Sequence, residues 1–347
     1  MPVTINEGCV PPSWANRNQR SHSFPMTVSG APGEVTKIAL INNMPDSALE
    51  DTELQFCELL EAAAVDIPVQ LQLFSLPDLV RGERGRQHIA KYYSRLDELR
   101  DGHFDGAIIT GTEPIQADLK EEPYWHTLTR LLDWASENTS STVLSCLAAH
   151  AGVLYSDGVK RNRLADKRFG VFVHRRASHH ELIDGIPDML PIPHSRWNEV
   201  REDALVAHGY SVLTKTVNGA VDLFVKKRNN SLFVHFQGHP EYERLTLLKE
   251  YRRDIRRFLK QERETYPTMP EGYFDQRSGN VLDAFRESVL KNRDADRMSQ
   301  FPDAAVVDSL QNTWKTSASA IYRNWLKYLV SHKSVSATGS AVHVGRK

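Results

Sequence analysis

Short apolar runs alternate along the chain with longer segments whose apolar residues recur at helical spacing. The short runs predict buried strands, because a strand covered on both faces needs no alternation with polar residues. The longer segments contain few helix breakers and predict helices. The predicted strands are 35–41, 69–74, 105–110, 142–146 and 231–236, and the predicted helices are 47–64, 122–137 and 243–260. This order predicts an α/β fold with a mostly parallel sheet flanked by helices.

The chain departs from this pattern at its two ends and near its middle. Residues 1–34 are polar and interrupted by prolines, so we expect an irregular arm there. The residues from about Ser331 onward are expected to form a frayed tail. Residues 160–200 are richer in Pro, His and Arg, which predicts long loops or short strands near a functional site.

The composition argues against several classes of protein and several kinds of binding site. Lys and Arg number 43 against 44 Asp and Glu, which leaves no global basic field for nucleic acid. The 347 residues include three cysteines without CxxC or other metal-ligand spacing, so neither a disulfide framework nor a metal site is expected. No run reaches the roughly 18 apolar residues of a membrane helix, and the N-terminus lacks an apolar signal region. We therefore expect a cytoplasmic globular protein with no membrane partner.

The segment 142–152, TVLSCLAAHAG, places Cys146 where a predicted strand meets a run of helix formers. Such a corner lies at the C-terminal edge of a parallel sheet, where open α/β folds bind ligands. The adjacent helix N-terminus would favour the nucleophilic thiolate, and the N–H of Leu147 could stabilise an oxyanion. A small packed core residue is the alternative for Cys146. That alternative suits Cys57, which lies in a helical apolar pattern, and nothing recommends Cys9 in the polar arm.

The segment 231–243, SLFVHFQGHPEYE, presents His239 at the end of a predicted strand. Gly238 permits a sharp turn before the imidazole, and Pro240 fixes φ after it. Glu241 follows two residues after His239, which suits a base and its orienting carboxylate. His235 lies mid-strand and is better read as packed against the sheet. Together with Cys146, these residues give a Cys-His-Glu hypothesis at one edge of the sheet.

These two segments also carry a family resemblance. The chain resembles the homoserine O-acyltransferases (O-succinyltransferases and their acetyl-transferring relatives) of the class I glutamine amidotransferase-like superfamily. The matching segments are INNMP, TELQF, DGAIITGTEP, EEPYW, TVLSCLAAHAG, LADKRFGVF, PIPHSRWNEV, GHPEYE, EYRRDI and NWLKYLV. The resemblance covers roughly 35–330. It implies a flavodoxin-like fold in one domain over that range, with a C-terminal helical segment at about 280–330 and a tail at 331–347.

The resemblance implies a ping-pong mechanism and a set of substrate contacts. Cys146 would attack an acyl-CoA, His239 would deprotonate the γ-hydroxyl of L-homoserine, and Glu241 would orient His239. The further contacts implied by the resemblance are Arg253 to the amino-acid carboxylate, and Lys167 and Ser195 to substrate. Acyl-CoA would be a co-substrate, with no bound cofactor, in methionine biosynthesis. The sequence does not set the oligomeric state, for which a homodimer would be unremarkable.

The chain differs from the family pattern at several positions. The acidic DSALEDTE, residues 46–53, stands where the family usually has a lysine pair after MP. Leu147 replaces a usual Trp, and His150 replaces a usual Gln. In the loop after ITG, succinyl-transferring members carry Gly and acetyl-transferring members Glu, whereas this chain has Ile115, with Glu113 two residues earlier.

These differences leave the acyl group and the acceptor open. Succinyl-CoA is favoured over acetyl-CoA because family members are most often of that kind. Serine or another amino acid could replace homoserine, because a pocket discriminates one methylene by only about 1–3 kcal/mol. Outside this reaction, the alternatives are a Cys-His-Glu glutamine amidohydrolase or amidotransferase, and a binding module without turnover.

Overall fold

A computed structural model of the chain describes residues 3–5, 11 and 35–339. The strands of its main sheet are β1 Val3–Ile5, β2 Thr36–Ile41, β3 Val69–Phe74, β4 Gly106–Ile109, β5 Ser141–Ser145, β8 Ser211–Val212, β10 Leu223–Arg228 and β11 Ser231–Phe236. A second sheet contains β6 Asn162–Arg176, β7 Met189–Glu199 and β9 Thr214–Thr216. All the strands predicted from the apolar runs are present.

Helices connect and cover these strands. They are α2 Leu49–Ala64, α3 Glu83–Tyr92, α4 Glu98–Asp101, α5 Trp125–Asn138, α6 Leu147–Asp157, α7 Glu202–Ala207, α8 Thr246–Leu259, α9 Gln276–Lys291, α10 Asp303–Val306 and α11 Lys315–Gly339. Short 3₁₀ helices are η1 Leu119–Glu121, η2 Glu181–Ile183 and η3 Ala295–Gln300. The predicted helices correspond to α2, α5 and α8.

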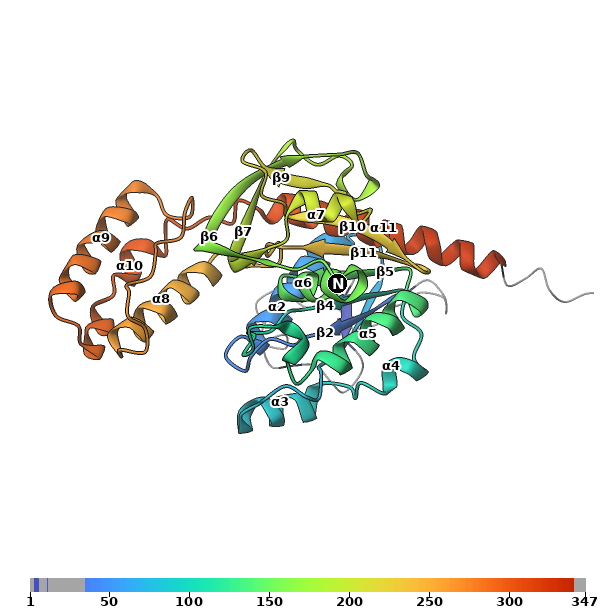
Figure 1. The fold of residues 1–347 in the computed structure, drawn as a ribbon, viewed down its shortest axis with the longest axis horizontal. Coiled ribbons are helices and arrows are strands. Elements are labelled where there is room, and N and C mark those ends of the chain that lie inside the picture. Colours follow the sequence, from blue (N-terminus) through green and yellow to red (C-terminus); the bar gives the residue numbers. More distant parts are fainter. Residues whose placement is uncertain (1–2, 6–10, 12–34, 340–347) are drawn as a thin grey trace, which may run out of the picture.

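The main sheet has the order β1-β3-β2-β4-β5-β11-β10-β8 (Figure 1). Neighbours from β1 to β11 run parallel, and β10 and β8 pair antiparallel at one end. Strands β4, β5 and β11 are buried along their whole length, because helices cover both faces of the sheet. This arrangement confirms the predicted α/β class with a mostly parallel sheet.

Each face of the main sheet has its own apolar core. On one face, α2 and α11 pack against residues such as Leu40 and Val234. On the other face, α5 and α6 pack against residues such as Ile109 and Phe233. The indole of Trp325 in α11 donates a hydrogen bond of 2.9 Å to the Ser141 hydroxyl in β5, which ties the last helix to the centre of the sheet.

The second sheet corrects the prediction for residues 160–200. That prediction of long loops or short strands was wrong, because β6 has 15 residues and β7 has 11. The sheet order is β7-β6-β9, so Pro191 and Pro193 lie on the edge strand β7, where proline is tolerated. The second sheet stands beside the C-terminal end of β11, where the Pro193 carbonyl accepts a hydrogen bond from the N–H of His239. The strand that contains these prolines therefore also carries a predicted site residue, Ser195.

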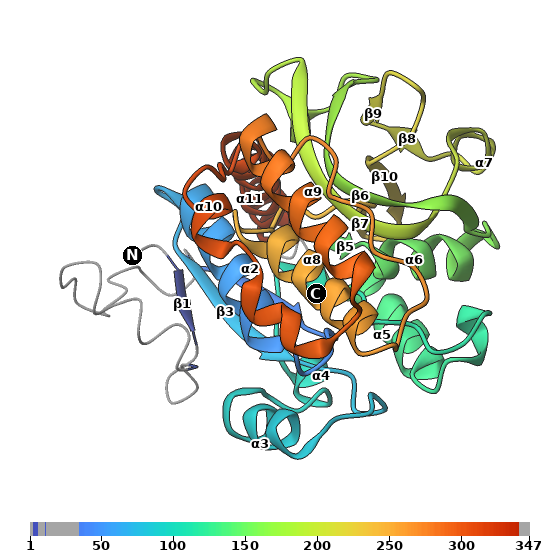
Figure 2. The ribbon, with the colours of Figure 1, turned by 90° about the vertical axis from the view of Figure 1, so that its left-hand side faces the viewer.

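Helices α8, α9 and α10 form a lobe beside the sheets (Figures 1 and 2). Helix α8 buries Leu248, Tyr251 and Ile255 in the core of this lobe, a spacing that leaves its arginines on the other side. Most of the expected arm 1–34, including Cys9, lies outside the described residues, but β1 within it pairs with β3. The expected tail boundary at 331 falls inside α11.

Candidate active site

Cys146 lies at a strained corner between β5 and α6. Its φ of 53° and ψ of −111° are unusual for a residue other than glycine, and such strain costs on the order of 1–3 kcal/mol. The backbone N–H of Cys146 donates to the carbonyl of Phe236 at 2.8 Å, which locks the corner to the end of β11. Cys146 is partly exposed, whereas Cys57 is buried in the core under α2. The predicted strand-to-helix corner is therefore present, and Cys146 is only partly buried there.

His239 and Glu241 meet Cys146 at the end of the neighbouring strand. The Nδ1 atom of His239 lies 2.8 Å from Oε1 of Glu241, and its ring stacks on Tyr242 with centroids 4.2 Å apart. The Cys146 side chain faces the imidazole closely enough to raise the pKa of His239. The structure thus brings together the three side chains that the sequence assigned to one edge of the sheet.

The charges around His239 set its pKa. Burial alone would lower the pKa of His239, but the facing Cys146 sulfur and the Glu241 carboxylate hold it well above its ordinary value. The site therefore favours a positive charge on His239 next to Cys146, an arrangement that suits a nucleophilic role for the cysteine.

Gly238 is required at the turn before His239 by close packing. A Cβ atom there would lie 2.7 Å from Ile192 Cγ2, 2.8 Å from Asp222 Oδ1 and 2.9 Å from His194 Cε1. The backbone N–H of Gly238 donates to Asp222 Oδ1 at 2.7 Å, and that of His239 donates to the Pro193 carbonyl at 2.8 Å. The turn is thus fixed by β7 and by Asp222.

The loop after β4 closes against the start of α6. A Cβ atom on Gly111 would lie 2.7 Å from the Cβ of Leu147 and 2.9 Å from its nitrogen. The first N–H groups of a helix have no acceptor within the helix, which keeps the N–H of Leu147 suited to the predicted oxyanion role. Gly111 was not singled out from the sequence, although it stands in the ITG segment.

The three predicted substrate contacts come together around one carboxylate. Glu250 Oε2 accepts a hydrogen bond of 2.5 Å from Ser195 and lies 3.6 Å from Lys167 Nζ and 3.5 Å from Arg253 Nη2. Lys167 also lies 3.4 Å from Asp254 Oδ2. We call these five residues the charged cluster. Glu250 was missed from the sequence, where it reads as one charge among many in EYRRDI.

The two residues of the predicted acyl-specificity loop lie at the surface. The Glu113 side chain is 63% exposed and 3.8 Å from Arg257, and Ile115 is 68% exposed. The buried Glu122 carboxylate fixes the loop by accepting backbone hydrogen bonds from Ile115 at 2.7 Å and Gln116 at 2.8 Å. Glu122 was not singled out from the sequence. A role for Glu113 or Ile115 in acyl choice stays a prediction.

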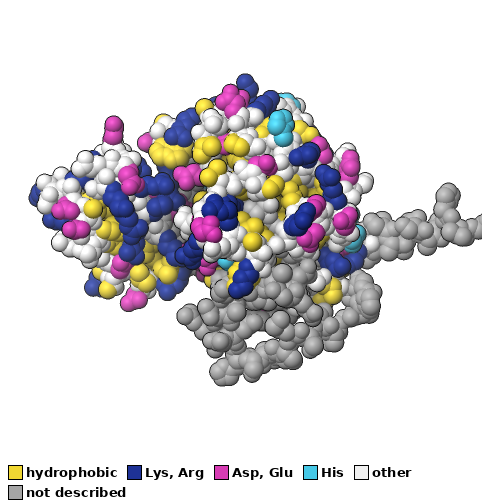
Figure 3. All heavy atoms as spheres, turned by 90° about the horizontal axis from the view of Figure 1, so that it is seen from below, with side chains coloured by type: hydrophobic (Ala, Val, Ile, Leu, Met, Phe, Trp, Pro, Cys, Tyr) yellow, Lys and Arg dark blue, Asp and Glu magenta, His cyan; other side chains and the backbone are white. Residues whose placement is uncertain are grey.

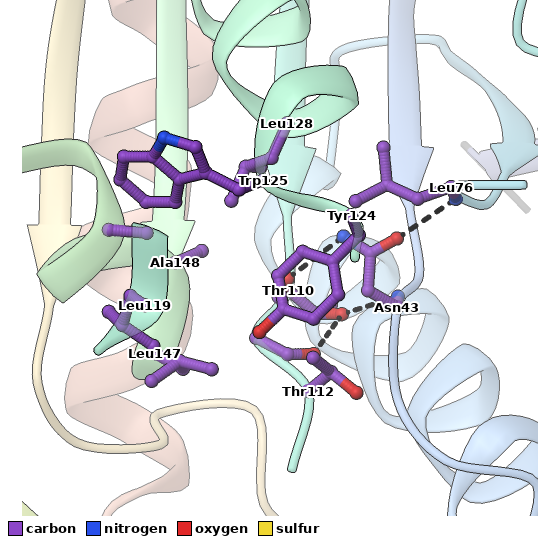
Figure 4. A pocket seen from close by; sticks show the side chains of 12 residues that line it. Asn43, Leu76, Thr110, Thr112, Leu119, Tyr124, Trp125, Leu128, Leu147 and Ala148 are labelled. Atoms are coloured by element: carbon purple, nitrogen blue, oxygen red, sulfur yellow. Dashed lines mark hydrogen bonds between the residues drawn. The ribbon is translucent and has the colours of Figure 1, made fainter. Parts of the chain in front are cut away.

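A pocket opens beside the corner on the side of Leu147 (Figure 4). Its free volume is about 10 Å³, room for about one water molecule. Its lining is mostly apolar and comes from Asn43, Leu76, Thr110, Gly111, Thr112, Leu119, Tyr124, Trp125, Leu128, Leu147, Ala148 and Ala151. The pocket therefore borders Leu147, the residue that follows Cys146, and is too small to hold more than about one water molecule.

Among the described residues, no group of His, Cys, Asp and Glu is arranged to hold a metal ion. Within the same residues, none of the helices has the length and apolar character that crossing a membrane requires.

Comparison with known proteins identifies the family. A family model described as homoserine O-succinyltransferase matches residues 22–336. The homoserine O-succinyltransferase of Rhodopseudomonas palustris is 44% identical over 301 residues, which cover 87% of this chain and 90% of that protein. The Bradyrhizobium japonicum protein of the same name is 42% identical, covering 86% of this chain and 91% of its own length. The chain belongs to the homoserine O-succinyltransferase family. Membership makes it an acyltransferase enzyme.

Two solved structures resemble the chain more distantly. Glutamine amidotransferases from Thermotoga maritima and Methylobacillus flagellatus each have a TM-score of 0.47, with 12% and 14% sequence identity. They cover 85% of this chain, and 98% and 95% of their own chains. The α/β class described above rests on the sheet order of the chain itself.

The structure accounts for two departures from the pattern of the homoserine O-succinyltransferase family. His150 is buried and contacts the side chain of Gln237 at 3.0 Å, and burial lowers its pKa to about 3, so it is a neutral packed residue. In the acidic loop after β2, Asp46 accepts a hydrogen bond from Gly82 N–H at 2.7 Å and pairs with Arg81 at 3.3 Å. The loop that replaces the lysine pair is thus tied to the start of α3.

Proposed function

We propose that the protein is a homoserine O-acyltransferase that carries the acyl group on Cys146, with succinyl-CoA favoured over acetyl-CoA. The observation that supports this most directly is the Cys146–His239–Glu241 group in a chain of the homoserine O-succinyltransferase family. The succinyl preference rests on the names of the curated relatives.

The first half-reaction would load the enzyme. The Cys146 thiolate attacks the thioester carbonyl of acyl-CoA, and the resulting oxyanion faces the N–H of Leu147 at the start of α6. The carbon–sulfur bond to CoA then breaks, and the imidazolium of His239 protonates the leaving CoA thiolate. The product is an acyl thioester on Cys146 beside a neutral His239. A thioester exchange of this kind conserves the activation of the acyl group.

The second half-reaction would transfer the acyl group to homoserine. Neutral His239, oriented by Glu241, removes the proton of the γ-hydroxyl while the oxygen attacks the acyl carbon. Breakage of the bond to Cys146 restores the thiolate beside a protonated His239. The charged cluster supports this step, because Arg253 and Lys167 offer cations to the acceptor carboxylate. No bound cofactor takes part in either step.

We place this reaction in methionine biosynthesis and in the cytoplasm. The reducing cytoplasm would keep a nucleophilic cysteine in its thiol form. L-homoserine and acyl-CoA would be the small-molecule partners. A homodimer stays a prediction, which analytical ultracentrifugation would test.

Intact-protein mass spectrometry tests the proposal. The wild-type chain is mixed separately with succinyl-CoA, acetyl-CoA and glutamine, and homoserine is added afterwards. We expect an acyl adduct from succinyl-CoA that homoserine discharges and that Cys146→Ala abolishes, while a Cys57→Ala control keeps it. An adduct that persists in Cys146→Ala would overturn the nucleophile assignment. A glutamyl adduct in place of an acyl adduct would instead indicate an amidohydrolase, and discharge by serine alone would indicate another acceptor.

A further inference from the structure

Glu250 occupies a position that the proposed reaction leaves without a role. It projects from α8 between β6 and β7, and its side chain is 14% exposed. Oε1 accepts a hydrogen bond of 2.8 Å from the Tyr242 hydroxyl, and Oε2 accepts one of 2.5 Å from Ser195. Two hydroxyl groups therefore orient the carboxylate, whose neighbouring cations, Lys167 and Arg253, lie at 3.6 and 3.5 Å.

The acceptor, if it is an amino acid as in the proposed function, brings two charges to this site. A zwitterion that leaves water needs a cation for its carboxylate and an anion for its ammonium group, since unpaired buried charges are costly. Arg253 is the candidate cation. Its side chain is 42% exposed, which leaves part of its guanidinium open to a ligand.

Glu250 is the carboxylate best placed to receive the ammonium group. The alternatives are engaged, because Glu241 is hydrogen-bonded to His239 and Asp254 accepts a hydrogen bond of 3.1 Å from Arg253 Nε. Asp254 also faces Lys167 at 3.4 Å through its other oxygen. The cations near Glu250 stand farther off, at 3.5 and 3.6 Å. An ammonium group can therefore approach Glu250 without displacing a short ion pair.

Tyr242 connects this carboxylate to the catalytic group. Its ring stacks on His239 at a centroid distance of 4.2 Å, while its hydroxyl donates to Glu250. Burial and the charge of Glu250 raise the pKa of Tyr242, which keeps the phenol protonated as a donor. The Tyr242 side chain thus spans the gap between Glu250 and His239. An acceptor whose ammonium group is bound to Glu250 could bring its hydroxyl to His239 if a short carbon chain separates the two groups. Figure 3 shows Lys and Arg side chains gathered where the helical lobe meets the rest of the molecule.

We propose that Glu250 binds the α-ammonium group of the acceptor, so that the site selects a free amino acid over a hydroxy acid. This inference rests on the proposed function, because it assigns a role in the second half-reaction. It extends that function by naming the residue that recognises the amino group.

The test compares homoserine with 4-hydroxybutyrate, which has the same chain and hydroxyl but no amino group. Wild type, Glu250→Gln and the control Glu262→Gln, an exposed residue just beyond α8, are first loaded with acyl-CoA. We expect equal acyl-enzyme formation by mass spectrometry in all three. The kcat/KM for homoserine should fall roughly 10- to 100-fold in Glu250→Gln, because a charge-assisted hydrogen bond is lost. The value for 4-hydroxybutyrate should stay within about threefold of wild type, since that acceptor never makes this contact.

The ratio of the two acceptors separates recognition from structural damage. If Glu250 binds the ammonium group, preference for homoserine collapses in Glu250→Gln and persists in Glu262→Gln. An equal loss with both acceptors would overturn the inference, because a residue that only supports the fold does not distinguish them. Failure of wild type to form any acyl-enzyme would contradict the proposed function instead.

A binding measurement decides the inference without turnover. Isothermal titration of homoserine and 4-hydroxybutyrate into Cys146→Ala should show tighter binding of homoserine. In Cys146→Ala/Glu250→Gln the two affinities should become similar. A homoserine preference that survives this second substitution would also overturn the role of Glu250.

Discussion

The corner at Cys146 and the charged cluster are built in opposite ways. At the corner, the parts that matter are backbone: a left-handed φ at Cys146, the N–H of Leu147 and the close approach of Gly111. In the charged cluster they are long side chains from β6, β7 and α8 that meet at Glu250. In the proposed reaction, the main sheet would thus position the group that captures the acyl chain, and the peripheral elements would select the acceptor.

The difference implies distinct responses to substitution. Backbone geometry tolerates almost no added volume, whereas a side-chain cluster can lose one contact and keep the rest. Changes at the corner should therefore slow both half-reactions, and changes in the charged cluster should affect acceptor use alone.

The largest effect is expected from Glu241→Gln. Loss of this carboxylate lowers the pKa of His239 from its raised value, so the imidazolium holds the Cys146 thiolate less well. Turnover should fall by roughly 10²–10⁴-fold. Iodoacetamide labelling of Cys146 from pH 5 to 9 checks this, with slower labelling expected near neutral pH in the variant. Equal labelling rates in Glu241→Gln and wild type would show that His239 does not depend on Glu241.

Gly238→Ala should reduce turnover less than Glu241→Gln does, but it should also lower the stability of the fold. The new methyl group would stand within 3 Å of Ile192, Asp222 and His194, and overpacking of this kind costs about 1–3 kcal/mol. Thermal unfolding measures this loss of stability, with Gly279→Ala in α9 as the control variant. A Cβ there meets nothing within 4 Å, so that change should stabilise the protein by up to about 1 kcal/mol. Similar melting temperatures for the two variants would contradict the packing argument.

Arg253→Lys should affect the acceptor side alone. A lysine keeps the charge but loses the planar fork that pairs with a carboxylate, so KM for homoserine should rise roughly tenfold. Acyl-enzyme formation from succinyl-CoA, followed by stopped-flow release of CoA, should be unchanged. If loading slows as much as transfer does, the separation between the two regions fails.

Glu113→Gln should produce the smallest effect. The Glu113 carboxylate is largely exposed and 3.8 Å from Arg257, and exposed pairs contribute at most about 1 kcal/mol. Steady-state rates with succinyl-CoA and acetyl-CoA should both stay within about fivefold of wild type. A change in the ratio of the two would give this loop the role in acyl choice that was predicted for it.

The sequence was sufficient to predict the parallel sheet and the meeting of Cys146, His239 and Glu241 at one edge of it. Strand 231–236 is mostly apolar and buried along its whole length because both of its faces are covered, and this signal is local. Cys146 and His239 could be placed because each ends such a strand, and the ends of parallel neighbours share one edge of the sheet.

The rest depends on contacts between segments that are distant in the chain. Strand β7 carries prolines that ordinarily argue against a strand, and only its place at the edge of the second sheet makes them acceptable. Glu250 resembles a solvated charge until β6 and β7 bring Lys167 and Ser195 against α8. The sequence suggested a turn requirement for Gly238, whereas the structure assigns it a packing requirement set by Asp222 and His194.

The hydrogen bond between Trp325 and Ser141 also has a consequence for the order in which the chain folds during synthesis. Helix α11 lies near the end of the chain, yet with α2 it covers a face of the sheet whose strands are synthesised much earlier. That apolar face stays partly open until the last helix leaves the ribosome and docks, and an open face of this kind promotes aggregation. Folding of the sheet is therefore completed only once α11 has been made and has docked, and a chain truncated before α11 would lack part of the cover of its own core.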